Sequence, residues 1–150
     1  MKLLAFSLIP AFLVSSLHAK ERAEGRQKPV VYNHVLEEGN AEDQIVKARY
    51  GNKYRIVEFR NDPTYIRSKN TKRVIPKPQR DVAGKLVTGS VRVCLIVTAQ
   101  GRVADPFVIR STNRKLDPVV LEAIKYWRGE PARLHGQAIS IALSQDVTFH

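Results

Sequence analysis

The sequence predicts an α+β protein in which a three-stranded antiparallel sheet, formed by a hairpin and the C-terminal strand, carries its helices on one face. Apolar and polar residues alternate over residues 91–97 and again over 138–149, which is the period of a strand with one buried face. A turn containing Gly101 joins the first of these strands to a second β-rich run at 103–111. An amphipathic helix over 116–127 then supplies the layer that covers the sheet.

Size and charge limit the classes of function. The chain has 150 residues, of which 43% are hydrophobic, and this fits one folded domain with additional segments. Its formal net charge of +11 favours anionic partners. The basic residues are spread over both halves of the chain, so we expect no nucleic-acid partner and only weak association with anionic envelope surfaces.

The N-terminus is typical of a secretory signal peptide. A positively charged start precedes a mostly apolar run, and small residues up to Ala19 resemble a cleavage region. We therefore divide the chain into a signal peptide at 1–19, a charged tether and N-terminal extension at 20–75, and a folded domain at 76–150. The alternative is that the apolar run is retained as an inner-membrane anchor, although it is short for a span and is interrupted by Pro10.

The middle of the chain has the weakest periodicity. Residues 20–28 form a charged tether, and Asn40 can cap a helix over 41–50. The β-rich residues 53–59 predict a strand. The cluster at 67–73 is interpreted as a basic, solvated loop.

Prolines organise the start of the folded domain. Pro76 and Pro78 mark its beginning, and residues 79–86 are compatible with one or two helical turns that Gly84 weakens. Pro106, in the second strand of the hairpin, cannot donate to a ladder, which places that strand at an edge of the sheet.

The helix over 116–127 is the clearest in the sequence. Asp117 is a good N-cap, Pro118 suits the first helical position, and Gly129 with the proline after it ends the helix. Trp127 lies on its apolar side and is expected in the core.

Chain directions predict the order of the strands. The hairpin strands and the helix alternate in direction, so the last strand, 138–149, must pair with 91–97, which becomes central. The outer edge of the last strand has no proline and only one charge, Asp146. Such an edge invites strand addition by another polypeptide, unless the chain's own strand at 53–59 covers it.

Several short motifs follow one another along the C-terminal half of the chain. The run GSVRVCLIVTAQGRVAD is followed by VIRST, LDPVVLEAIKYWR, EPA and a closing β-strand. Over about residues 76–149 the chain resembles the TonB C-terminal domain family. The resemblance implies a periplasmic domain without enzymatic activity or cofactors, which contacts outer-membrane receptors through its last strand in support of transmembrane transport.

The resemblance also places the site. Carried over by position, the pairing edge comprises Ile139, Ser140, Ile141, Ala142, Leu143, Ser144, Gln145, Asp146 and Val147. Lys77 and Pro78 are the nearest match to a Tyr-Pro pair that precedes the first strand in the family, and we expect them to contact the partner. The partner is a receptor segment or another envelope protein, and edge pairing would equally allow a homodimer.

The sequence carries no motif that indicates an enzyme. Its four histidines have no metal-ligand spacing, and no nucleophile, phosphate-binding or dinucleotide motif is present. The single cysteine, Cys94, lies inside a strand pattern and is interpreted as a structural thiol. Two alternatives to the receptor-binding module remain: a basic envelope protein that binds anionic surfaces, and a membrane-anchored energy transducer.

Overall fold

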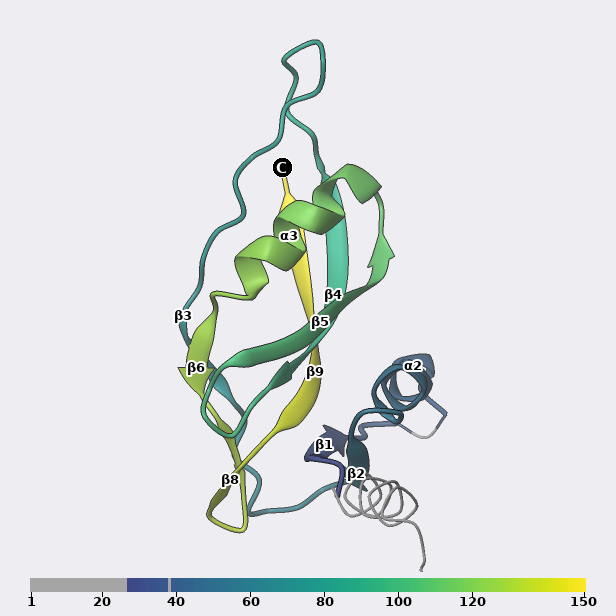
Figure 1. Cartoon of the computed structure of the whole chain (residues 1–150), viewed down its shortest axis with the longest axis vertical. Coiled ribbons are helices and arrows are strands. Elements are labelled where there is room, and N and C mark those ends of the chain that lie inside the picture. Colours follow the sequence, from purple (N-terminus) through teal and green to yellow (C-terminus); the bar gives the residue numbers. More distant parts are fainter. Residues whose placement is uncertain (1–26, 38) are drawn as a thin grey trace, which may run out of the picture.

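The computed structural model describes residues 27–37 and 39–150, and the predicted signal peptide lies outside them. In the described residues the main sheet has five strands in the order β2-β1-β9-β4-β5 (Figure 1). These strands are β1 (Val30–His34), β2 (Arg55–Phe59), β4 (Gly89–Val97), β5 (Val103–Ser111) and β9 (Ile141–Phe149). The helices are α2 (Ala41–Tyr50) and α3 (Asp117–Ile124), the latter preceded by the 3-10 turn η1 (Arg114–Leu116). Within these ranges, no helix has both the length and the apolar character to cross a membrane.

The two predicted neighbours of the strand at 91–97 are confirmed. β4 pairs antiparallel with β5 on one side and with β9 on the other, and the β4–β9 register is continuous from Gly89↔Phe149 to Val97↔Ile141. Gly101 takes a φ of +74° in the hairpin turn, which the Thr98 N–H closes by donating to the Arg102 carbonyl at 2.8 Å. β4 therefore lies between β5 and β9 as predicted, although β9 takes the middle position of the five-stranded sheet.

The prediction of a three-stranded sheet is wrong, because the N-terminal extension adds two more strands. β1 runs parallel to β9, and β2 runs parallel to β1. Parallel neighbours need a crossover connection, and α2 supplies it between β1 and β2. Short strands joined in this way leave no hairpin signal in the sequence.

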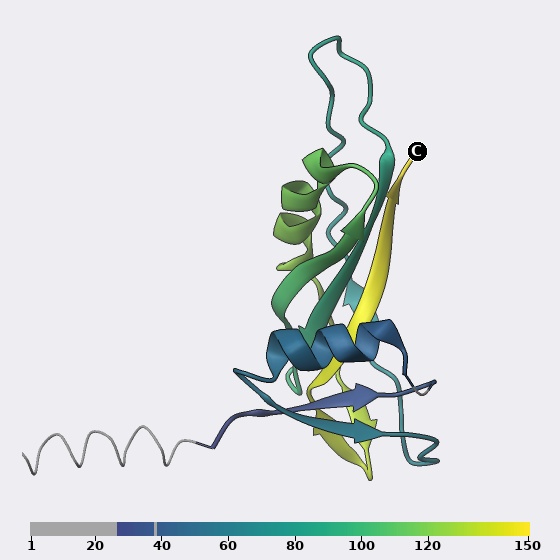
Figure 2. The same cartoon turned by 90° about the vertical axis from the view of Figure 1, so that its right-hand side faces the viewer.

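The expectation that helices cover one face only is also wrong. Val91, Val93 and Leu95 of β4 point into the core that contains α3, with Val120 and Ile124 fully buried there. The alternate residues Cys94 and Ile96 point the other way and pack with Val46 and Tyr50 of α2. Both faces of the central strand are thus buried, and Figure 2 shows α2 crossing the lower part of the sheet away from α3.

The helix at 116–127 is shorter than predicted. Its entry is capped by Asn113, whose side chain accepts a hydrogen bond from the Lys115 N–H, so Asp117 is not the N-cap. The helix ends at Ile124, and Trp127 follows it as a buried core residue, as expected, with its Nε1 donating to the Val74 carbonyl at 2.9 Å. Pro118 does lie in the first turn.

Three further local predictions are corrected. The basic segment at 67–73 contains a strand, β3 (Lys69–Lys72), which pairs with β6 (Arg128–Glu130). Residues 79–86 form a turn rather than a helix, because the Asp81 carboxylate accepts hydrogen bonds from the N–H groups of Ala83 and Lys85. The last strand is divided in two: β8 (Gln137–Ile139) pairs with β7 (Ala132–Leu134), and β9 begins only after Ser140.

Candidate strand-addition edge

The outer edge of β9 is covered over only part of its length. β1 pairs with β9 at Tyr32↔Ile141 and Asn33↔Ala142, and no strand of the described chain pairs with the same side of β9 beyond Ala142. The strand at 53–59 does not cover this edge, since β2 lies on the far side of β1. We call the uncovered stretch, Leu143 to Phe149, the open edge.

Hydrogen bonding identifies the backbone groups that point outward from this edge. The Ser140 carbonyl accepts a hydrogen bond from the Tyr32 N–H at 2.8 Å, so residue 140 faces β1. Successive residues of a strand direct their N–H and C=O groups to opposite sides, and the β4–β9 register has no bulge. The N–H and C=O groups of Ser144, Asp146 and Thr148 therefore point away from β4, toward the free side.

The structure divides the predicted site residues into three groups. Ile139 belongs to β8 and pairs with Ala132. β1 lies beside Ser140, Ile141 and Ala142 in the sheet and covers their side of β9. The remaining predicted residues, Leu143, Ser144, Gln145, Asp146 and Val147, lie on the open edge, and Thr148 and Phe149 extend it. The strand periodicity at 138–149 already included these last two positions.

The two faces of the open edge differ in chemistry. On the α3 face, Val147 lies beside a groove of about 220 Å³ whose walls include Val74, Ile75 and Trp127. Figure 2 shows the segment between β3 and β4 on the same side of the sheet as α3. On the opposite face the side chains are polar: Ser144, Asp146 and Thr148. An added strand would thus meet apolar groups on one face and polar groups on the other.

Arg92 connects the polar face of the edge to α2. Its guanidinium contacts both carboxylate oxygens of Glu42, at 2.5 and 3.0 Å, and Asp146 Oδ2 at 2.5 Å. The hydrogen bond from Arg92 lowers the pKa of the Glu42 carboxyl, and the same contact raises the pKa of Arg92. The only acidic side chain of β9 is therefore held by the protein itself.

Lys77 and Pro78 do not lie at the open edge. Both side chains are exposed, and Lys77 lines a mainly apolar groove between the segment after β3 and α3, together with Val119 and Tyr126. Whether either residue contacts a partner stays a prediction.

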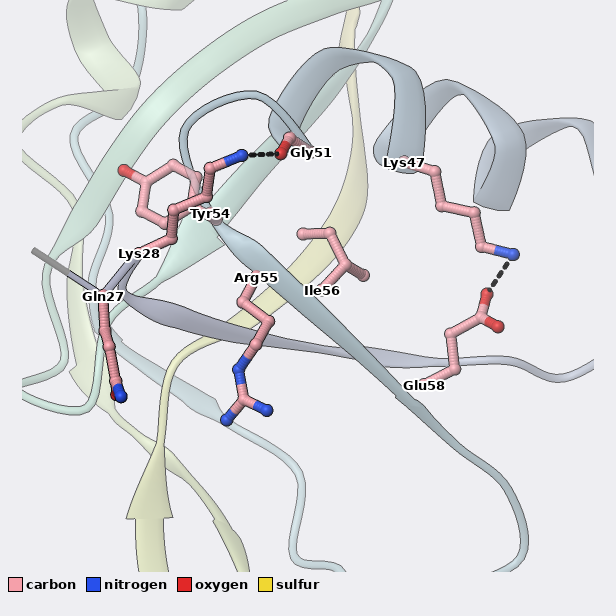
Figure 3. Close-up of a pocket in the computed structure, with 8 residues that line it drawn as sticks. All are labelled: Gln27, Lys28, Lys47, Gly51, Tyr54, Arg55, Ile56 and Glu58. Atoms are coloured by element: carbon pink, nitrogen blue, oxygen red, sulfur yellow. Dashed lines mark hydrogen bonds and ion pairs between the residues drawn. The ribbon is translucent and has the colours of Figure 1, made fainter. Parts of the chain in front are cut away.

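A pocket of about 940 Å³ lies elsewhere on the described part of the chain (Figure 3). It lies at the outer edge of β2 and includes Lys28, whose Nζ donates to the Gly51 carbonyl at 3.0 Å. Lys47 forms an ion pair with Glu58 at 2.8 Å across one end of it. Within residues 27–37 and 39–150, no group of three or more His, Cys, Asp or Glu residues could hold a metal ion.

The fold and this edge define the class of protein: a small α+β domain in which one strand of the sheet is unpaired along part of one side. Residues 80–150 match the family model of the Gram-negative bacterial TonB protein C-terminal domain, and this part of the chain belongs to that family. Among solved structures, the chain is similar to the Pseudomonas aeruginosa TonB CTD determined by solution NMR. That similarity has 27% identity and a TM-score of 0.47, and it covers 60% of this chain and 89% of the other. No curated protein matches the chain.

Proposed function

We propose that this protein is a periplasmic, non-enzymatic interaction module that binds an extended segment of an outer-membrane receptor by strand addition at the open edge of β9, in support of TonB-dependent transport. The observation that carries the proposal is the end of β1 pairing at Ala142, which leaves a strand of the main sheet with a free side. Unpaired main-chain groups in a regular strand are a template for another chain.

Two further features support this edge as the docking position. Its backbone is held in register by the continuous ladder with β4, so the outward groups are fixed before binding. Its α3 face borders the groove at Trp127 and Val74, which can receive alternate side chains of an added strand. The opposite edge, β5, contains Pro106, which cannot donate to a ladder.

The experiment measures binding of N-terminal peptides of TonB-dependent receptors to Thr148→Pro and Thr148→Ala. Proline removes an outward N–H without touching the ladder with β4, and we expect it to weaken binding about tenfold. Alanine keeps the N–H and changes only an exposed side chain, so binding should stay within about twofold. Ser144→Pro and Ser144→Ala form a second matched pair.

NMR titration supplies the positional control. Amide signals of residues 143–149 should shift on addition of the peptide. Equal affinities for the proline and alanine variants, or shifts confined to another surface, would refute the proposed edge. Peptide-independent dimerisation that Thr148→Pro abolishes would assign the edge to a second copy of this chain instead.

The topology of the exported protein is tested separately. We propose that the segment at 1–19 is removed as a signal peptide. Intact-mass measurement of the protein from the periplasm should then show the loss of about this segment. A full-length mass in the membrane fraction would support the anchored energy transducer.

A further inference from the structure

A basic surface lies on and around the two-stranded sheet of β3 and β6. We call it the basic ribbon; it comprises Arg67, Lys69, Lys72, Arg73, Arg102 and Arg128. All four residues of β3 are exposed, as are Arg102 and Arg128. Figure 1 shows β3 and β6 side by side, on the opposite side of the molecule from α2. Arg73 lies over the Trp127 ring, 4.8 Å from its centroid, and lines the groove beside the open edge, but neither the core nor the proposed strand addition requires the other five cations.

Strand register brings three of these cations into one row. Lys72 lies opposite Arg128 in the β3–β6 pair, and Arg128 lies opposite Arg102 across an antiparallel bridge. Directly opposite residues of antiparallel strands project from the same face, with Cβ atoms about 5 Å apart. Like charges in this arrangement repel each other and are destabilising. An external anion would relieve the repulsion.

The chain itself provides little compensation for this row. Within the described residues, no acidic side chain forms an ion pair with Lys69, Lys72 or Arg102. The Arg128 guanidinium donates to backbone carbonyls, including that of Trp127 at 2.7 Å, which leaves its charge unneutralised. The nearest carboxylate in register is Glu130, opposite Lys69, and it does not approach within ion-pair distance.

Exposed aliphatic side chains lie at both ends of the basic segment. Ile66, immediately before it, is 60% exposed, and Ile75, just after it, is 84% exposed. A soluble polyanion offers no apolar surface for these isoleucines to contact. A membrane interface takes both kinds of side chain, because lysine and arginine meet the lipid phosphates while aliphatic groups enter the boundary with the acyl chains.

We propose that the basic ribbon binds the surface of a bilayer that contains anionic phospholipid, with Lys69, Lys72 and Arg102 facing the headgroup phosphates and Ile66 and Ile75 entering the interface. Lys69, Lys72 and Arg102 do not line the groove beside the open edge, although Ile75 does. Substitution of these three cations therefore tests membrane binding without altering the proposed strand-addition site.

The experiment measures co-sedimentation of the full chain with vesicles of phosphatidylethanolamine and phosphatidylglycerol, and with vesicles of neutral lipid only. The triple variant Lys69→Gln/Lys72→Gln/Arg102→Gln is compared with Lys85→Gln/Arg114→Gln/Lys115→Gln, which removes the same charge from exposed positions elsewhere. Each cation near an anionic surface contributes roughly fivefold, so the ribbon variant should bind about a hundredfold more weakly. The control should change binding less than about fivefold. The N-terminal segment is identical in all variants, so any contribution that it makes to vesicle binding cancels in the ratio of two variants.

Two further arms separate the possible outcomes. Ile75→Ser should weaken vesicle binding several-fold, whereas Leu36→Ser, at a residue 70% exposed outside the ribbon, should not. Binding should fall as salt rises, because the attraction is screened. Equal losses in both triple variants, equal binding to neutral vesicles, or competition by inorganic phosphate with no effect of Ile75→Ser would overturn the proposal. Circular dichroism of each variant confirms that the fold is retained.

Discussion

Arg92 should be the side chain that couples the N-terminal extension to the TonB-like domain. It reaches from the central strand to Glu42 on α2 and to Asp146 on β9, which lie 50 and 54 positions away in sequence. The Arg92 side chain is 23% exposed and that of Glu42 30% exposed, so the contacts are partly shielded from water. Arg92→Met keeps the aliphatic stem and removes the charge.

The expected loss follows from these contacts. A hydrogen bond to a charged group contributes about 1.5–3 kcal/mol when buried, and an exposed ion pair less than about 1 kcal/mol. With a bidentate contact to Glu42 and one to Asp146, at intermediate exposure, we expect Arg92→Met to lower the free energy of unfolding by about 2 kcal/mol. Glu42→Gln should cost less, because Asp146 still pairs with Arg92.

Urea unfolding followed by tryptophan fluorescence measures these changes, since Trp127 is the only tryptophan. A double-mutant cycle of Arg92→Met and Glu42→Gln should give a coupling of about 1 kcal/mol. Because the pKa of Glu42 is lowered in the folded protein, its contribution is complete above its unfolded pKa near 4.3 and is lost as the pH falls through the lower folded value. A loss below about 0.5 kcal/mol at pH 7, or a Glu42 coupling that does not weaken as the pH is lowered, would refute the reasoning.

Two further predictions concern the hairpin turn and the buried thiol. Gly101→Ala should destabilise the protein by about 3 kcal/mol or more, because the residue has positive φ and its new Cβ would lie 1.8 Å from the Gly129 carbonyl oxygen. The control, Gly84→Ala, has a similar φ but open space around the new Cβ, so it should cost only about 1 kcal/mol. Equal losses of stability in urea unfolding would contradict this explanation. Cys94 should resist alkylation by iodoacetamide at pH 8 until the protein is unfolded, because the thiol is buried and burial raises its pKa to about 11. Mass spectrometry measures the alkylated fraction, and rapid labelling of the native protein would contradict this prediction.

The parts of the fold that the sequence predicted are those with a local signal. The hairpin was predictable because strand alternation and a glycine at the turn act within a few residues. The helix at 41–50 was predictable from Asn40, whose side chain does accept from the Glu42 N–H at 2.9 Å. The errors at α3 are of the same local kind, since Asn113 and Asp117 are equally suitable caps and only the backbone path selects Asn113.

The position of the last strand beside β4 was predicted, but the length of its unpaired side was not. Chain direction alone places the last strand beside the central one, which exposes its other side. How much of that side is free depends on β1, whose pairing stops at Asn33↔Ala142. The carbonyl of Ser140 is occupied for the same reason. No periodicity in residues 30–34 could reveal which strand they would join.

By itself, the sequence determined the hairpin, the presence of two helices, the two neighbours of the strand at 91–97 and the family of residues 80–150, because periodicity, turn residues and motif spacing are properties of neighbouring positions. Only the tertiary structure decided that the sheet has five strands, that α2 buries the second face, and that the open edge begins after Ala142. The same holds for the row of Lys72, Arg128 and Arg102, which lie far apart in sequence. These features arise from pairings between distant segments, whose register is set by the packing of the whole core.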